Sequence, residues 1–191
     1  MTCVVAVSRR TSALLAADTQ GTTPTTYQRA DRADTKVFNL APWLAIGGSG
    51  SYRAIQIVRY HIDARDWSLP AEHDRHGWAV TTLVPALRTA LRDNGALRVV
   101  NGVEQGDTYL VAVGRSIFIV YSDWQVAAPR TPYAAIGAGD DIAVGYLAAG
   151  IEAGKRLTIS AATRAIRAAA IHNASVGRNV TIAEAEESTD A

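Results

Sequence analysis

The feature that most constrains the fold of this chain is a set of short runs of consecutive apolar residues, without the alternation of apolar and polar residues that marks a half-exposed strand. Two of them open the sequence, at Cys3–Val7 and Ala13–Ala17, and the polar residues 8–12 between them predict a β-hairpin. A second hairpin is predicted for Tyr109–Val113 and Ile117–Tyr121. Strands that are apolar on both faces need cover on both faces. These runs therefore predict sheet buried on both sides.

The remaining segments add further strands and four helical patterns. Short strands are predicted at Thr35–Phe38, Trp43–Ile46, Tyr133–Ile136 and Asn179–Ala183. A first helix is predicted after Ser51, with Ile55, Val58 and Ile62 at helical spacing, and a second over Trp78–Asp93, where Pro85 marks a kink or the true first turn. A third helix is predicted from Asp140 or Asp141 to Gly150. A fourth begins at Thr158 or Ser160 and has one face formed by Ile159, Ala162, Ile166 and Ala169. This order indicates a mixed α/β (α+β) protein. A four-layer αββα sandwich would cover both sheet faces, although layer rules do not uniquely demand it.

Length and composition indicate one domain over residues 1–183, followed by an acidic tail at 184–191 that we expect to be disordered. The net charge of +1 gives no electrostatic footprint for nucleic acid or an anionic membrane. The apolar runs are far shorter than the roughly 20 residues of a membrane-spanning helix. The single cysteine, Cys3, excludes an internal disulfide, and no signal peptide is recognisable, so a cytoplasmic location is expected.

The first candidate for chemistry is Thr2, which becomes the N-terminal residue if Met1 is removed. A free N-terminal threonine carries a nucleophilic hydroxyl and a base, its α-amine, in one residue. The unperturbed pKa of that amine, roughly 7.7–8.0, leaves a useful neutral fraction near pH 7. The alternative is that Met-Thr simply begins a strand.

Asp18, Lys36 and a glycine-rich turn would complete such a site. A cation beside Thr2 favours the alkoxide and the neutral amine, and a carboxylate can hold that cation in place. Gly47-Gly48-Ser49-Gly50 precedes a predicted helix, so its backbone N–H groups can stabilise an oxyanion. Each feature also has an ordinary structural alternative, namely a surface lysine, a turn aspartate and a tight turn without a ligand.

Other groups of residues give weaker indications of a functional site. His73 and His76 lie in a charged stretch that reads as a solvated loop more readily than as a metal site. No Gly-x-Ser-x-Gly motif is present to anchor a serine triad. Cys3 follows Thr2 directly, so on a strand it points to the opposite face and serves as a small core residue. No cofactor or metal is expected.

Together these residues resemble the proteasome β subunits and the related bacterial proteasome-like peptidases. The motifs are Thr2 at the first strand, Ala16–Thr22, Lys36-Val37-Phe38, Ile46–Gly50 and Ala135–Gly139. The likeness covers Thr2 to about Ile182 and is greatest to small proteasome-like proteins of bacteria and phages. It implies an N-terminal-nucleophile hydrolase fold with two antiparallel sheets between helix layers.

The resemblance also implies roles for individual residues. Thr2 matches the nucleophile, Asp18 and Lys36 the charged pair beside it, and Gly50 the oxyanion-hole glycine, with a slip to Gly48 left open. In the same way Thr22, with Gly48 and Ser49, matches the segments that pair with an extended peptide. Two positions depart from the pattern, because Ala138 lacks the expected hydroxyl and Asn173 replaces the expected acidic residue.

The implied activity is that of a threonine-type endopeptidase or amidohydrolase acting on polypeptides. The alternative is a catalytically silent subunit of the same fold with an assembly or binding role, motivated by Ala138 and Asn173. The resemblance further implies a homo-oligomer, as a dimer or ring, and leaves room for an ATP-dependent unfoldase partner. No nucleic-acid or membrane partner is expected.

Overall fold

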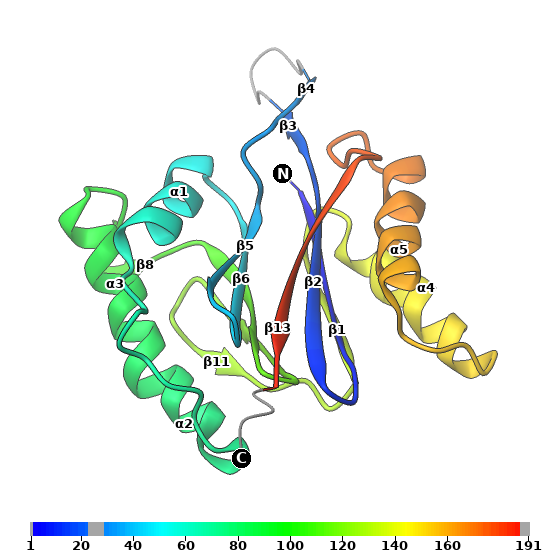
Figure 1. Cartoon of the computed structure of the whole chain (residues 1–191). Helices are drawn as coiled ribbons and strands as arrows, with labels where there is room; N and C mark the ends of the chain where they lie inside the picture. Colours follow the sequence, from blue (N-terminus) through cyan, green and yellow to red (C-terminus); the bar gives the residue numbers. More distant parts are fainter. Residues whose placement is uncertain (1, 23–28, 188–191) are drawn as a thin grey trace.

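Two β-sheets packed face to face form the centre of the protein, with helices outside each of them (Figure 1). The computed structural model describes residues 2–22 and 29–187. Helices α1 to α3 cover one sheet and helices α4 and α5 cover the other (Figure 1). The predicted αββα sandwich of two antiparallel sheets is therefore confirmed.

The first sheet has the strand order β12-β1-β2-β13, and all its neighbours are antiparallel. Its strands are β1 Cys3–Ser8, β2 Ser12–Asp18, β12 Tyr133–Gly137 and β13 Val180–Glu186. The predicted opening hairpin is confirmed as β1 and β2, with Val5 opposite Ala16.

The second sheet has the order β11-β10-β9-β6-β5 and is also antiparallel. Its strands are β5 Val37–Ala41, β6 Leu44–Ser49, β9 Thr108–Val113, β10 Ser116–Val120 and β11 Val126–Ala127. Two small ribbons pair β3 Gln20–Thr22 with β4 Arg29–Asp31 and β7 Arg98–Val100 with β8 Val103–Gln105.

Three apolar clusters hold the four layers together. The first packs α1 and α3 on the second sheet and includes Ile46, Leu87 and Tyr109. The second lies between the sheets, where Leu15 of β2 meets residues of β9. The third joins the first sheet to α4 and α5, and contains Leu14 of the same β2 strand. Neighbouring residues of one strand thus enter different cores, which is why the strand sequences are apolar throughout.

The helices are α1 Tyr52–His61, α2 Arg75–Trp78, α3 Val84–Asp93, α4 Asp140–Glu152 and α5 Ile159–His172. A π-helical segment, Ala79–Leu83, joins α2 to α3 directly before Pro85. Because proline has no N–H and its ring crowds the carbonyl four residues earlier, a wider turn suits this position. The predicted helix over Trp78–Asp93 thus starts earlier, and the loop expected around His73 and His76 is instead a short 3-10 turn, Glu72–Asp74, followed by α2.

The ends of the last two helices also differ in part from expectation. Gly139, rather than Asp140 or Asp141, is the N-cap of α4, because the Asp140 carboxylate accepts from its neighbour Asp141 N instead of capping the turn. For α5 the predicted cap Thr158 is confirmed, since its hydroxyl accepts from Ala161 N. Ile159 is exposed, and Ala165 takes its expected place on the buried face.

The predicted boundary between domain and tail at residue 183 differs from the structure. Strand β13 continues to Glu186 because Glu184–Glu186 complete the antiparallel ladder with β2. The Glu187 carboxylate then binds the buried guanidinium of Arg75, with Nη1 at 3.1 Å, and accepts from Arg115 N at 2.9 Å. Residues 188–191 of the expected tail lie outside the described residues. In the described ranges no helix has the length and apolar character needed to cross a bilayer.

The ion pair at the end of β13 predicts a pH-dependent contribution to stability. Hydrogen bonding to Arg75 lowers the pKa of Glu187, so the stabilisation is present near neutral pH and is lost as pH falls through the folded-state pKa. Glu187→Gln should lower the free energy of unfolding at pH 7 by about 2 kcal/mol, because Arg75 is left buried without a carboxylate.

Urea denaturation at pH 7 and below about pH 4 tests this expectation. The effect of Glu187→Gln should shrink at the lower pH. Glu186→Gln changes the neighbouring, exposed carboxylate and is the matched control. Equal effects of the two variants, or an effect of Glu187→Gln that does not change with pH, would contradict the assignment.

Candidate active site

Thr2, Asp18 and Lys36 come together at the end of the sandwich from which β3 and β4 extend (Figure 1). Thr2 directly precedes β1, Asp18 ends β2, and Lys36 directly precedes β5. The hairpin places Val4 opposite Ala17, so the start of β1 lies beside the end of β2. All three side chains are buried.

The Asp18 carboxylate is the centre of the arrangement and is completely buried. Its Oδ1 accepts from Thr2 Oγ1 at 2.6 Å, Cys3 N at 2.9 Å and Lys36 Nζ at 2.9 Å. Its Oδ2 accepts from the main chain at Gly177 N, 2.9 Å, and Gln20 N, 3.2 Å. A buried carboxylate is tolerated when charge and hydrogen bonds compensate its lost hydration, and here both are supplied.

Lys36 is held on one side by Asp18 and on the other by the Gln20 carbonyl, 2.8 Å from Nζ. Burial lowers the pKa of Lys36, and the charge of Asp18 acts in the opposite direction without cancelling that effect. Nζ also lies 5.8 Å from the ring centroid of Tyr52. The site thus combines a fixed cation with a hydroxyl on a shared carboxylate, which is an arrangement that can stabilise an alkoxide.

The glycine-rich turn assigns different tasks to its two candidate glycines. Gly48 N donates to the Lys36 carbonyl at 3.0 Å, so this N–H is used within the fold. Gly50 has φ +145°, and a Cβ there would lie 2.4 Å from Cγ of Asp107. Among the turns and loops of the described residues, Gly50 N donates to no backbone carbonyl. Of the two, Gly50 is therefore the better candidate for an oxyanion donor.

Ser49 of this turn lies near the Thr2 main chain, across the space beside Gly137. At Gly137, where φ is +99°, an added Cβ would lie 2.3 Å from the Thr2 carbonyl oxygen and 2.9 Å from Ser49 Oγ. The Ser49 hydroxyl and the Thr2 main chain therefore border the same small space, which exists because residue 137 has no side chain. Within the described ranges no hydrogen bond engages the Ser49 hydroxyl.

Solved structures with this architecture establish the fold. Thiobacillus denitrificans BPH in complex with epoxomicin superposes with a TM-score of 0.77 at 20% identity, covering 97% of this chain and 99% of that chain. The chain has the proteasome-type N-terminal-nucleophile hydrolase fold. A second structure of Thiobacillus denitrificans BPH gives a TM-score of 0.77 at 20% identity, covering 98% of this chain and 100% of the other. Eukaryotic HslV from Trypanosoma brucei gives 0.68 at 16% identity, covering 96% and 99%.

Comparison of the sequence alone finds no relative, in contrast to the comparison of structures. No protein-family model matches the chain, and no curated protein matches it. At 20% identity or less the structural likeness shows the proteasome-type fold alone, so the roles of individual residues depend on the geometry of this chain.

The two departures from the proteasome-type pattern lie side by side. Asn173, the C-cap of α5, donates from Nδ2 to the Ala138 carbonyl at 2.6 Å, and its Oδ1 accepts from Ser175 N at 2.9 Å. The Asn173 side chain therefore fastens the end of α5 to the turn after β12. It has a structural task here, and Ala138 contributes its carbonyl to that task.

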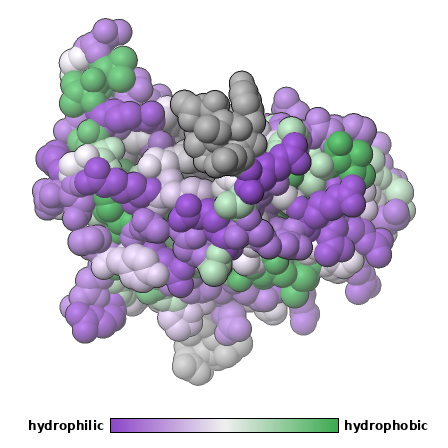
Figure 2. Space-filling model, turned by 90° about the horizontal axis from the view of Figure 1, so that it is seen from above, coloured by the Kyte–Doolittle hydropathy of each residue, from purple (hydrophilic) through white to green (hydrophobic). Residues whose placement is uncertain are grey.

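Polar groups surround the approach to the site. Thr22 Oγ1 accepts from Gln20 Nε2 at 3.1 Å, and β3 pairs with β4. A cavity of about 240 Å³ adjoins Gln20 and Gly177, both of which bind Asp18. Seen from this end, the described surface is mostly hydrophilic, with hydrophobic residues in separate patches (Figure 2).

Cys3 is not a competing nucleophile. Its side chain is fully buried in the cluster with α4 and α5. Burial and the nearby Asp18 charge raise the pKa of its thiol to about 12, so the reactive thiolate is absent near neutral pH. The expected separation of Thr2 and Cys3 onto different faces of the strand is consistent with these contacts.

Gln20 and Gly177 were missed by the sequence analysis. Both act on Asp18 through backbone N–H groups, which every residue except proline carries, so residue type gave no signal. The only sign of this contact in the sequence is that residue 177 is a glycine. A Cβ at Gly177 would lie 2.7 Å from the Gln20 Cβ, so the close approach of these two segments needs a glycine.

The buried Asp18–Lys36 pair predicts strong energetic coupling between the two residues. Asp18→Asn should lower the free energy of unfolding by about 3–5 kcal/mol, because the Lys36 charge stays buried without a counter-charge. Asp18→Asn combined with Lys36→Met should cost at least about 1 kcal/mol less than the sum of the two single changes.

Urea denaturation of the four proteins of this cycle measures the coupling. Asp63→Asn is the control, since it breaks an ion pair of the same charge type that is exposed, with Arg65 as its partner. It should leave the unfolding free energy unchanged within error. Strict additivity of the Asp18 and Lys36 effects would contradict the buried pair.

Proposed function

We propose that this protein is a threonine-type peptidase in which Thr2 is the nucleophile after Met1 is removed. The observation that carries the proposal is the buried Thr2–Asp18–Lys36 cluster, in which one carboxylate binds both the hydroxyl and the cation. The proteasome-type fold supports it, because the cluster lies at the start of the first strand in that fold.

The chemistry is acyl transfer through a covalent intermediate. The Thr2 hydroxyl attacks the carbonyl carbon of a peptide bond, and the proton of the hydroxyl passes to the α-amine of the same residue. The amine then gives a proton to the leaving nitrogen as the C–N bond breaks. Water attacks the resulting ester, which releases the acyl group as a carboxylic acid and restores the Thr2 hydroxyl.

Each neighbouring group has a part in these steps. Lys36, held by Asp18 and Gln20, favours negative charge on the Thr2 oxygen. Gly50 N–H donates to the oxyanion of the tetrahedral intermediate. Ser49, whose hydroxyl borders the Thr2 main chain, orients the water or the amine during proton transfer.

The substrate class we propose is polypeptide in extended conformation. Strand β3, with Thr22 at its end, would pair with the substrate backbone as an added strand. The complex of Thiobacillus denitrificans BPH with epoxomicin supports the choice of that compound as a probe for this chain. Self-assembly into a homo-oligomer, and an unfoldase partner, stay predictions from the resemblance.

A silent subunit of the same fold is the second candidate. It is favoured by Ala138, which offers no hydroxyl, and by Asn173, whose amide is engaged with the Ala138 carbonyl. Both candidates share the fold, so only the state and reactivity of Thr2 distinguish them.

The test of the peptidase is the mass and activity of the full chain. Intact mass should show loss of Met1, and hydrolysis of fluorogenic peptides should be inhibited by epoxomicin. Thr2→Ala should reduce kcat/KM by at least about a thousandfold, while Thr2→Ser should keep part of the activity because it retains a hydroxyl and an α-amine.

Cys3→Ala is the matched control, since it changes the adjacent residue without touching the hydroxyl. An electrophilic peptide probe should label wild type and Cys3→Ala but not Thr2→Ala. Retention of Met1 in the working protein, or hydrolysis that survives Thr2→Ala, would sink the peptidase. Retained Met1 with no hydrolysis would favour the silent subunit.

Ser49 gives a finer prediction for the same site. Ser49→Ala should lower kcat by about tenfold, or about 1.4 kcal/mol in activation free energy, because the hydroxyl that orients proton transfer is lost. Its effect on KM should be small, and the pH profile of kcat should shift. Ser51→Ala, two residues away at the start of α1, is the control. An unchanged kcat and pH profile in Ser49→Ala would remove this residue from the mechanism.

A further inference from the structure

The start of strand β9 holds the glycine-rich turn on both sides of Gly50. Before the glycine, Ser49 of β6 pairs with Thr108 of β9. After the glycine, Ser51 N donates to Oδ2 of Asp107 at 2.8 Å. The main chain is therefore anchored to β9 immediately before and immediately after the candidate oxyanion donor.

The Asp107 side chain also fills the space in which other residues would carry a Cβ at position 50. A Cβ at Gly50 would lie 2.4 Å from Cγ, 2.5 Å from Oδ1 and 2.7 Å from Oδ2 of Asp107. The φ of +145° at Gly50 is likewise a conformation that only glycine adopts readily. The carboxylate thus packs directly on the Gly50 main chain, which it can do only because this residue has no side chain.

Arg98 of β7 holds the Asp107 carboxylate in this position. Its Nη2 lies 3.2 Å from Oδ1 of Asp107 and donates to the Gly106 carbonyl at 2.7 Å. The Asp107 side chain is only 10% exposed, whereas that of Arg98 is 61% exposed. Because the arginine also binds the main chain next to Asp107, it restricts the directions in which the carboxylate can point.

The direction of the Gly50 N–H follows from the strand geometry. Gly48 N donates to the Lys36 carbonyl, on the β5 side of β6. Successive residues of a strand form hydrogen bonds on alternate sides, so the Ser49 carbonyl faces β9. The N–H of Gly50 points the opposite way in the same planar peptide, toward the side of Lys36. Thr2 belongs to the cluster on that side.

We propose that Asp107 is a positioning residue that directs the Gly50 N–H toward the oxyanion formed at Thr2. The inference rests on the proposed peptidase function and adds to it the group that preorganises the donor. A donor that is fixed before the reaction needs no reorganisation as charge develops in the transition state. Asp107 acts through the main chain of Ser51 and Gly50 and does not itself touch the substrate.

Replacement of Asp107 in the full chain, with a fluorogenic peptide as substrate, tests this role. Asp107→Ala should lower kcat and kcat/KM together by at least about tenfold, because the donor acts in the transition state and loses its fixed direction. Asp107→Asn keeps an acceptor oxygen for Ser51 N, so its kcat should stay within about threefold of wild type.

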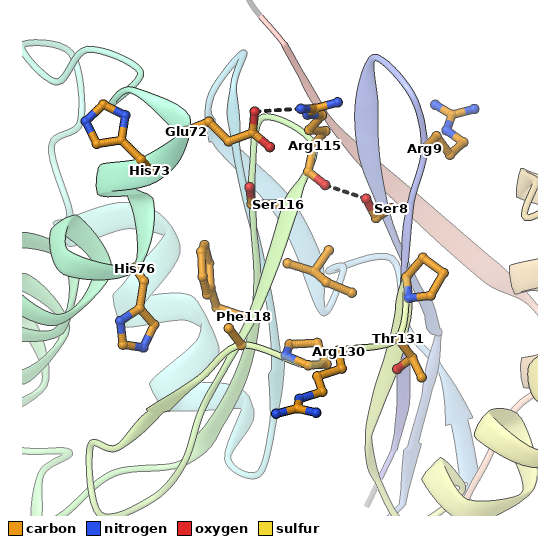
Figure 3. A pocket seen from close by; sticks show the side chains of 14 residues that line it. Ser8, Arg9, Glu72, His73, His76, Arg115, Ser116, Phe118, Arg130 and Thr131 are labelled. Atoms are coloured by element: carbon orange, nitrogen blue, oxygen red, sulfur yellow. Dashed lines mark hydrogen bonds and ion pairs between the residues drawn. The ribbon is translucent and has the colours of Figure 1, made fainter.

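Glu72→Ala is the matched control and should leave kcat unchanged. Glu72 also pairs with an arginine, Arg115, at 2.6 Å, but this pair lies beside the cavity shown in Figure 3. Strand β9 separates the two ion pairs, since it begins next to Asp107 and ends at Val113, shortly before Arg115.

Amide hydrogen exchange of the same proteins, measured by mass spectrometry, separates this role from the peptidase activity itself. Asp107→Ala should speed exchange in the peptide that contains Gly50 and Ser51, while Asp107→Asn and Glu72→Ala should not. If the wild type hydrolyses no peptide, the peptidase is overturned, but faster local exchange in Asp107→Ala still supports the fixed turn.

Four results would overturn the role of Asp107. They are unchanged exchange at this turn in Asp107→Ala, an unchanged kcat of that variant in an active protein, and an equal loss of kcat in Asp107→Asn. The fourth is faster exchange over the whole chain in Asp107→Ala, because it would show a general loss of stability.

Discussion

The buried ion pair between Asp18 and Lys36 is the interaction on which the rest of the structure depends. Asp18 is fully buried and ties together the start of β1, the start of β5 and the loop before β13. A carboxylate in such a place is stable only while its partners stay in position, because an unpaired buried charge costs several kcal/mol. The four donors that come from other segments therefore fix how strands of both sheets meet at this end. The same contacts place the Thr2 hydroxyl.

The charged groups at the two ends of the sandwich are compensated in different ways. At the Thr2 end, each charge of the central cluster has a partner, and the polarity is enclosed among main-chain donors. At the far end, Arg9 is paired with Glu184 and Arg115 with Glu72, while the exposed Arg130 has no partner among the described residues. The first arrangement suits a preorganised reaction centre. The second is the usual state of charged groups on a surface in contact with water.

Ala138 and Asn173, the two departures from the expected pattern, are joined to each other by a hydrogen bond. The Asn173 amide bridges the end of α5 to the turn after β12, which an aspartate could not do because it has no donor to give the Ala138 carbonyl. A hydroxyl near Thr2 is nonetheless present, from Ser49 on β6. This hydroxyl comes from the other sheet and borders the Thr2 carbonyl.

The sequence by itself determined that the sheets are covered on both faces, because strands such as Val4–Val7 and Leu14–Ala17 are apolar on both faces. It also singled out Thr2, Asp18, Lys36 and the glycine-rich turn, because their residue types indicate what chemistry they can perform. Tertiary structure decided the rest, since Gly177 and Gln20 act through main-chain groups that leave no mark on residue type. The tail was misjudged at Glu184 because its strand exists only when paired with β2. The ion pair between Arg9 and Glu184 likewise joins segments far apart in the sequence, and no local sequence pattern predicts it.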